Sequence, residues 1–281
     1  MRIRVVAVQP SSGSGASESR NAAESLNWIR RAAENQADLV VFPEGYPGPI
    51  NPSNNYDALG PLAEAAATLR VHVIASRAVP AGAGHSVELS LIDDHGQILG
   101  TYRRTTPCGP YVYRDIEAWN FDYVESNAPP RVFETRIGRI GMLVCSELYS
   151  PELSRLLMLQ GADIIAYPAG GAINELLPGW RTLVYARAIE NLLFTVACQN
   201  LYGEEKGVGT IAGPEGVLAQ RQDEGLIAAD LDFDRLAFLR AEDEKVEFPK
   251  RYATIPGVQR WRRPELYGGL VEPRTRPAAG D

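Results

Sequence analysis

The chain has 281 residues, with hydrophobic and charged shares of 45% and 22% that are close to the averages for soluble globular proteins. This length is consistent with one large domain built around one extended core. The formal net charge of −7 has the wrong sign for a protein whose main partner is a phosphate backbone, so we expect no nucleic-acid ligand. No apolar run has the length of a signal-peptide core or a membrane span, which favours a cytoplasmic protein without membrane contact.

The chain contains three cysteines, Cys108, Cys145 and Cys198. An odd number without metal-ligand spacing suggests neither a disulfide framework nor a zinc site. A cysteine with a special role would therefore be reactive rather than structural. Cys198 lies inside an apolar run and is expected to be structural, and the same interpretation is the simpler one for Cys108.

Apolar runs of strand length alternate with segments of helical period along most of the chain. We expect strands over 3–8, 37–42, 71–78, 87–92, 97–103, 131–135, 139–144, 162–167 and 193–199, and helices over 19–34, 57–69, 151–160 and 180–191. A further strand-turn-strand surrounds residues 213–216, and residues 105–130 are predicted to form a long functional loop. This alternation indicates a sheet-rich α/β or α+β architecture.

The domain organisation follows from the same pattern. We expect one domain over residues 1–240. Residues 241–281 are charged, contain several prolines and show little periodicity, so we expect a C-terminal tail that packs on the body or on a partner subunit.

Three reactive positions lie at or just beyond the ends of predicted strands: Glu44, the arginine pair Arg103-Arg104 and Cys145. Sites in open α/β sheets gather at the carboxyl edges of strands. A cysteine at a strand-to-turn junction is held rigidly, and the backbone N–H groups that follow it can bind a developing oxyanion. A nearby carboxylate can take its proton. The alternative interpretation of Cys145 is a small buried hydrophobe that ends a core strand.

Two segments resemble signature segments of the nitrilase superfamily of carbon–nitrogen hydrolases. Residues 39–45, with sequence LVVFPEG, are similar to the segment that carries the family's general-base glutamate, and residues 141–152 are similar to its nucleophile elbow. Further matches follow in the family's order at 161–163, 167–169, 180, 187–191, 200 and 209–214. The resemblance covers roughly residues 3–235 and depends on the ordered agreement of many pieces.

The resemblance implies a four-layer αββα sandwich and hydrolysis of an amide, carbamoyl amine or nitrile. Glu44 would deprotonate Cys145, whose thiolate would form a thioester or thioimidate that water then releases. The resemblance implies no metal or organic cofactor. It favours a homodimer or a larger homo-oligomer.

The sequence departs from the family at its third catalytic group, a lysine usually found in a Tyr-Arg-Lys context. Here the sequence is Tyr102-Arg103-Arg104, so Arg104 occupies the position of the family's lysine. Arginine stays protonated and can only donate hydrogen bonds and charge. Three explanations remain open: an active enzyme in which Arg104 stabilises the oxyanion, a weakly active or inactive binding or regulatory protein, and a drift from lysine to arginine in an arginine-rich chain.

The predicted loop and its neighbours supply the remaining site candidates. Residues 116–119 resemble the Ile-Glu-Gly-Trp segment of aliphatic amidases, which makes Glu117 the candidate for a second catalytic glutamate, with Glu125 as the runner-up; both are otherwise interpreted as solvated acids. Candidate substrate-binding residues are Tyr46, Tyr111, Tyr113, Trp119, Ser146 and Tyr149. The aromatic residues among them can equally serve to pack the loops.

The sequence therefore favours a hydrolase of a small non-peptide amide through a Cys145 thioester. Nitrile hydrolysis by the same site is the first alternative. A nitrilase-like binding or regulatory protein is the alternative from another functional class.

Overall fold

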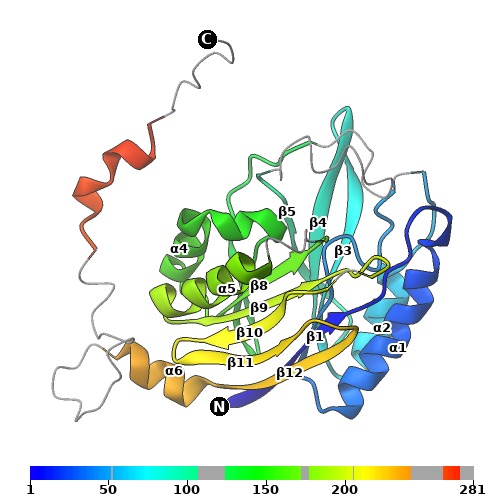
Figure 1. The fold of residues 1–281 in the computed structure, drawn as a ribbon, viewed down its shortest axis with the longest axis horizontal. Helices are drawn as coiled ribbons and strands as arrows, with labels where there is room; N and C mark the ends of the chain where they lie inside the picture. Colours follow the sequence, from blue (N-terminus) through cyan, green and yellow to red (C-terminus); the bar gives the residue numbers. More distant parts are fainter. Residues whose placement is uncertain (52, 107–123, 172–176, 205, 242–261, 273–281) are drawn as a thin grey trace.

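The computed structural model describes residues 1–51, 53–106, 124–171, 177–204, 206–241 and 262–272. Among these residues, two six-stranded mixed sheets lie face to face (Figure 1). The strands of the first sheet are, in spatial order, β12 (Gly225–Asp232), β1 (Arg2–Gln9), β2 (Leu39–Val41), β3 (His72–Ala81), β4 (Gly84–Ile92) and β5 (Ile98–Arg103). Those of the second sheet are β11 (Gly216–Arg221), β10 (Gly209–Gly213), β9 (Phe194–Gln199), β8 (Ile164–Ala169), β7 (Gly138–Met142) and β6 (Val132–Thr135).

The centre of each sheet is parallel and its flanks are antiparallel. Strands β1, β2 and β3 run parallel in the first sheet, as do β7, β8 and β9 in the second. Every residue of β2, β8 and β9 is buried, which explains why these strands appear in the sequence as continuous apolar runs. Because parallel strands end at the same edge, the residues that follow β2, β7, β8 and β9 can meet at one place.

Helices cover the outer faces of both sheets, so the layers are helix, sheet, sheet, helix (Figure 1). Helices α1 (Arg20–Glu34) and α2 (Leu59–Leu69) lie on the first sheet, and α4 (Pro151–Leu159) and α5 (Leu177–Asn191) lie on the second. Helix α6 (Phe233–Arg240) follows β12. This arrangement confirms the expected four-layer αββα sandwich.

Two hydrophobic clusters hold the layers together. Alternate residues of β1 show the division, since Val5 and Ala7 belong to a cluster between the sheets, whereas Val6 and Val8 belong to a cluster beneath α1 and α2. The inner cluster, which also extends beneath α4 and α5, draws residues from both sheets.

Most predicted elements are present within a few residues of their expected bounds, but two were not predicted. Strand β12 pairs with β1 along eight residues, from Arg2↔Asp232 to Gln9↔Gly225, and α6 follows it directly. Residues 225–240 therefore close the first sheet.

Two further expectations concern membrane spans and the C-terminal tail. In the described ranges, no helix combines the length and apolar character needed to cross a bilayer. Residues 242–261 and 273–281 lie outside the described residues, so the packing of the C-terminal tail stays a prediction.

Candidate active site

Three strand ends bring Glu44, Arg104 and Cys145 together. Glu44 follows β2 after Phe42 and Pro43, Arg104 follows the last residue of β5, and Cys145 follows β7 after Leu143 and Val144. All three are buried, with exposed fractions of 2%, 0% and 7%. Cys145 also begins a 3-10 helix, η3 (Cys145–Tyr149), with φ of +47°, a conformation that non-glycine residues seldom adopt. Such a backbone is typical of functional turns, because the surrounding structure has to hold it.

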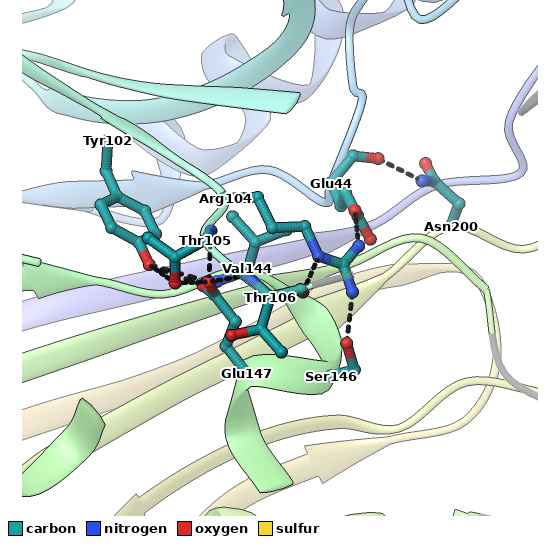
Figure 2. Close-up of polar contacts among 9 residues, drawn as sticks. All are labelled: Glu44, Tyr102, Arg104, Thr105, Thr106, Val144, Ser146, Glu147 and Asn200. Carbon is teal, nitrogen blue, oxygen red and sulfur yellow. Dashed lines mark hydrogen bonds and ion pairs between the residues drawn. The ribbon is translucent and has the colours of Figure 1, made fainter. Parts of the chain in front are cut away.

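The guanidinium group of Arg104 lies at the centre of the cluster (Figure 2). Its Nη1 donates to Glu44 Oε1 at 2.6 Å, its Nε donates to the carbonyl oxygen of Thr106 at 2.8 Å, and its Nη2 donates to Ser146 Oγ. The planar fork of arginine suits three such partners in fixed directions. Arg104 therefore connects the candidate base with the residue next to the candidate nucleophile.

The backbone of Glu44 is held from the second sheet. Asn200 Nδ2 donates to the Glu44 carbonyl oxygen at 2.7 Å (Figure 2). The Glu44 N–H donates to the carbonyl oxygen of Ala169 at 3.3 Å. Ser12 Oγ in turn donates to Asn200 Oδ1 at 2.6 Å. Asn200 follows β9 and Ala169 ends β8. Glu44 is thus fixed relative to both sheets.

Burial raises the pKa of the Glu44 carboxyl above its ordinary value. The charge of Arg104 and a hydrogen bond from Cys145 oppose this change without cancelling it. A carboxylate with a raised pKa that accepts a hydrogen bond from a thiol is a stronger base than an exposed glutamate and is suited to take and return a proton.

Glu147 fastens the end of β5 to the elbow that carries Cys145 (Figure 2). Its carboxylate has no exposed surface and accepts hydrogen bonds from the hydroxyl groups of Tyr102 and Thr105 and from the backbone N–H groups of Thr105, Thr106 and Val144, at 2.7–3.2 Å. Thr105 and Thr106 directly follow Arg104, and Val144 directly precedes Cys145. One buried carboxylate therefore connects the two segments that carry these side chains.

The other predicted site residues have different outcomes. Tyr46 is wholly buried in the cluster beneath α1 and α2 and stacks on Phe42. Its aromatic ring contributes to the packing of the outer helices, and a role in substrate binding stays a prediction. Tyr149 is 48% exposed and meets Trp180 edge to face at 5.8 Å, and Glu125 has an exposed side chain.

Several candidates lie outside the described residues. These are Cys108, Tyr111, Tyr113, Glu117 and Trp119. Their places in the site stay predictions. Cys198, expected to be structural, is fully buried in β9, where its thiol donates to the carbonyl oxygen of Val41.

Glu147 and Asn200 lie at positions where the sequence resembles the family, but their contacts in the site were not predicted from the sequence. The available signal was their position, since each polar residue directly follows or nearly follows a buried strand. Their hydrogen-bond partners are far away in sequence and could not be named in advance. Within the described residues, no group of three or more histidine, cysteine or acidic side chains is arranged to hold a metal ion.

Comparisons with known proteins agree with this geometry. The carbon–nitrogen hydrolase family model matches residues 3–241. The chain is 27% identical over 289 aligned positions to N-carbamoylputrescine amidase of Arabidopsis thaliana, a match that covers 90% of each protein. The structure resembles a carbon–nitrogen hydrolase from Helicobacter pylori G27, with TM-score 0.78, 20% identity, and coverage of 97% and 99% of the two chains.

A second solved structure is that of a cysteine-to-alanine mutant of the amidase from Nesterenkonia sp. AN1 in complex with butyramide. It aligns with TM-score 0.69 and 23% identity over 84% of this chain and 93% of that one. The family model spans most of the chain, including all three strand ends that form the site. The chain therefore belongs to the carbon–nitrogen hydrolase family, the nitrilase superfamily, as an amidase-like enzyme.

Proposed function

We propose that the protein hydrolyses the C–N bond of a small non-peptide amide through a covalent thioester on Cys145. The observation that carries the proposal is the buried contact set in which Glu44 accepts hydrogen bonds from both Cys145 and Arg104. A carboxylate beside a thiol, with a fixed cation bonded to that carboxylate and to the residue after the cysteine, supplies a base, a nucleophile and electrostatic stabilisation.

The reaction begins when Glu44 takes the thiol proton of Cys145. The thiolate sulfur then bonds to the carbonyl carbon, and the π electron pair of the carbonyl moves onto its oxygen. As the C–N bond breaks, Glu44 returns its proton to the departing nitrogen. Water, deprotonated by Glu44, then attacks the thioester carbon. The C–S bond breaks, the acid leaves, and Glu44 returns the proton to the sulfur of Cys145.

Arg104 takes the electrostatic role that the family assigns to lysine. It stays charged throughout the cycle, so it lowers the energy of Glu44 as a carboxylate and that of negative charge near Cys145. Proton transfer remains with Glu44. The second carboxylate expected from Glu117 is retained in this proposal as a group that orients the substrate or the attacking water.

The relatives suggest which substrates to test. One acts on a carbamoyl amine, and another binds butyramide, so both a carbamoyl group and a short acyl amide are reasonable probes. Sites of this kind recognise acyl shape through the loops around the nucleophile. We therefore propose short aliphatic amides as the first class and N-carbamoyl amines as the second.

Intact-mass spectrometry tests this function directly. The protein is incubated with acetamide, butyramide, N-carbamoylputrescine and butyronitrile, quenched in acid and weighed. We expect an amide to form an acyl adduct on the protein. This adduct should disappear as the substrate is consumed and the acid product accumulates. Cys145→Ala should form no adduct, whereas Cys198→Ala, a change in a fully buried strand cysteine, should be acylated like the parent.

Each outcome distinguishes the alternatives. Turnover of butyronitrile with no turnover of the amides would replace amide hydrolysis with nitrile hydrolysis at the same site. Adduct formation on Cys145→Ala would show that the nucleophile is wrong. A parent that is never acylated would favour a binding or regulatory protein that keeps the hydrolase fold.

A further inference from the structure

Ser146 is the polar side chain through which the buried charge of Arg104 can reach a substrate. Arg104 has no exposed surface, and its guanidinium group donates hydrogen bonds to Glu44, Thr106 and Ser146. Of these partners, Thr106 contributes a carbonyl oxygen and Glu44 a carboxylate, and neither can donate to an oxyanion. Ser146 alone among them meets the guanidinium group with a hydroxyl group, and its side chain is only half-buried.

The direction of the Arg104 contact decides what the Ser146 hydroxyl can do. A serine hydroxyl has one donor hydrogen and two acceptor lone pairs. Because Arg104 Nη2 donates to Ser146 Oγ, one lone pair is occupied and the hydroxyl hydrogen remains for another acceptor. Among the described residues, no acceptor is paired with that hydrogen. A hydroxyl that accepts a hydrogen bond from a cation is polarised and becomes a stronger donor.

The position of Ser146 matches the need of the reaction. It is the residue next to Cys145, within the same 3-10 helix η3, and the positive φ of Cys145 begins this turn. When sulfur attacks a carbonyl carbon, the negative charge develops on an oxygen one bond from that carbon. Donors placed at that point before the reaction are among the largest contributors to catalysis.

We propose that the Ser146 hydroxyl donates a hydrogen bond to the substrate oxygen as it becomes an oxyanion, so that Ser146 delivers the charge of Arg104. The serine proton is shared and not transferred. Glu44 keeps the proton taken from Cys145 and returns it to the departing nitrogen. Arg104 and Ser146 together thus provide what a single flexible ammonium group would provide if it contacted the oxyanion directly. This inference rests on the proposed thioester chemistry.

The test compares Ser146→Ala, which removes the hydroxyl, with Ser146→Thr, which keeps it. With the amide that acylates Cys145, Ser146→Ala should lower kcat by about 10²–10³-fold, the effect of losing one oxyanion donor, with a much smaller change in KM. Ser146→Thr should stay within about tenfold of the parent, because its hydroxyl can accept from Arg104 and donate in the same way. Ser150→Ala is the matched control, since Ser150 lies on the same elbow and its side chain makes no capping hydrogen bond.

A second measurement separates catalysis from damage to the elbow. Methyl methanethiosulfonate reacts with a thiolate at sulfur and forms no oxyanion on carbon, so it reports only the position and ionisation of Cys145. Ser146→Ala should react with this reagent at the parent's rate while its acylation by the amide is slow. That split would support an oxyanion donor.

Three results would overturn the inference: parent-like kcat in Ser146→Ala, equal losses in Ser146→Ala and Ser146→Thr, or an equal loss of thiol reactivity and amide turnover in Ser146→Ala. Each of them would leave the Cys145 thioester in place. A parent that forms no acyl adduct would instead reject the proposed function, and this inference with it.

Discussion

Arg104 influences the candidate active site through one buried side chain. It donates to Glu44 and to Ser146 at once. Glu44 accepts a hydrogen bond from Cys145, and Ser146 is the residue after Cys145. Replacement by alanine removes a buried cation and leaves the Glu44 carboxylate without its charged partner, a change that is strongly unfavourable in a buried site. The effect on catalysis should therefore be large.

We expect Arg104→Ala to lower kcat/KM by about 10²-fold or more, as other losses of transition-state charge stabilisation do. Arg104→Lys should retain or raise turnover, because lysine keeps the charge and matches the family pattern. Arg103→Ala provides the control, since Arg103 pairs with Glu88 and its side chain is 44% exposed. Steady-state kinetics gives kcat/KM for the three variants. If all three values matched that of the parent, Arg104 would have no role in catalysis.

The pH dependence of turnover should report the Glu44 carboxyl. Burial raises its pKa, and the base acts only when deprotonated, so kcat/KM should fall as the pH drops through a value above that of an exposed glutamate. The charge of Arg104 lowers the same pKa. Arg104→Ala should therefore move the acid limb of the profile to higher pH. A limb that stays in place would show that Glu44 and Arg104 are not coupled.

At the scale of elements, the end of β5 and the elbow after β7 depend on Glu147. Its carboxylate oxygens accept hydrogen bonds, among them those from the N–H groups of Thr105 and Val144. Glu147→Gln keeps the shape but places an amide N–H₂ against one or more of these buried donors. An unsatisfied buried donor costs about 1–3 kcal/mol. The change should also loosen the segments that carry Arg104 and Cys145.

We therefore expect Glu147→Gln to lower both the thermal midpoint and kcat. Glu134→Gln is the matched control, because Glu134 is an exposed residue of the neighbouring strand β6. Differential scanning fluorimetry and amide turnover measure the two effects separately. Parent-like values for both would mean that Glu147 does not fasten the elbow.

The elements of the site differ in how far sequence could predict them. Glu44 and Cys145 were identifiable because each directly follows a continuous apolar run, and such runs become the buried strands β2 and β7. The donors to Glu147 were not, since Tyr102 and Thr105 lie 45 and 42 residues away and approach only when the two sheets pack. For Tyr46, proximity to Glu44 in sequence did not reveal that its ring packs in the cluster beneath α1 and α2.

At the scale of the whole molecule, β12 shows why one strand escaped prediction. Its sequence mixes alanine and aspartate, residues with low strand preference, so local propensity argues against it. Pairing with β1 overrides that preference, because it supplies backbone partners along eight residues and buries Ile227, Ala229 and Leu231 between the sheets. Arg2 and Arg4 also form exposed ion pairs with Asp232 and Asp230 across the two strands, which contribute little. These contacts span about 230 residues of sequence and depend on the completed fold.

The contribution of this closure can be measured at Leu231, which is fully buried in the cluster between the sheets. Leu231→Ala should lower the free energy of unfolding by about 2–5 kcal/mol, the usual cost of a large-to-small change in a core. Leu218→Ala, at a residue of β11 that is 46% exposed, should change it by no more than about 0.5 kcal/mol. Urea denaturation followed by tryptophan fluorescence gives both values.

Leu231 belongs to neither the strand ends nor the turns that carry Glu44, Arg104 and Cys145, so its loss should affect stability without affecting chemistry. At a temperature where Leu231→Ala remains folded, its kcat should equal that of the parent. A large fall in kcat under those conditions would show that the closing strand controls the geometry of the active site. Equal unfolding midpoints for the two leucine variants would show that β12 contributes little to the common core.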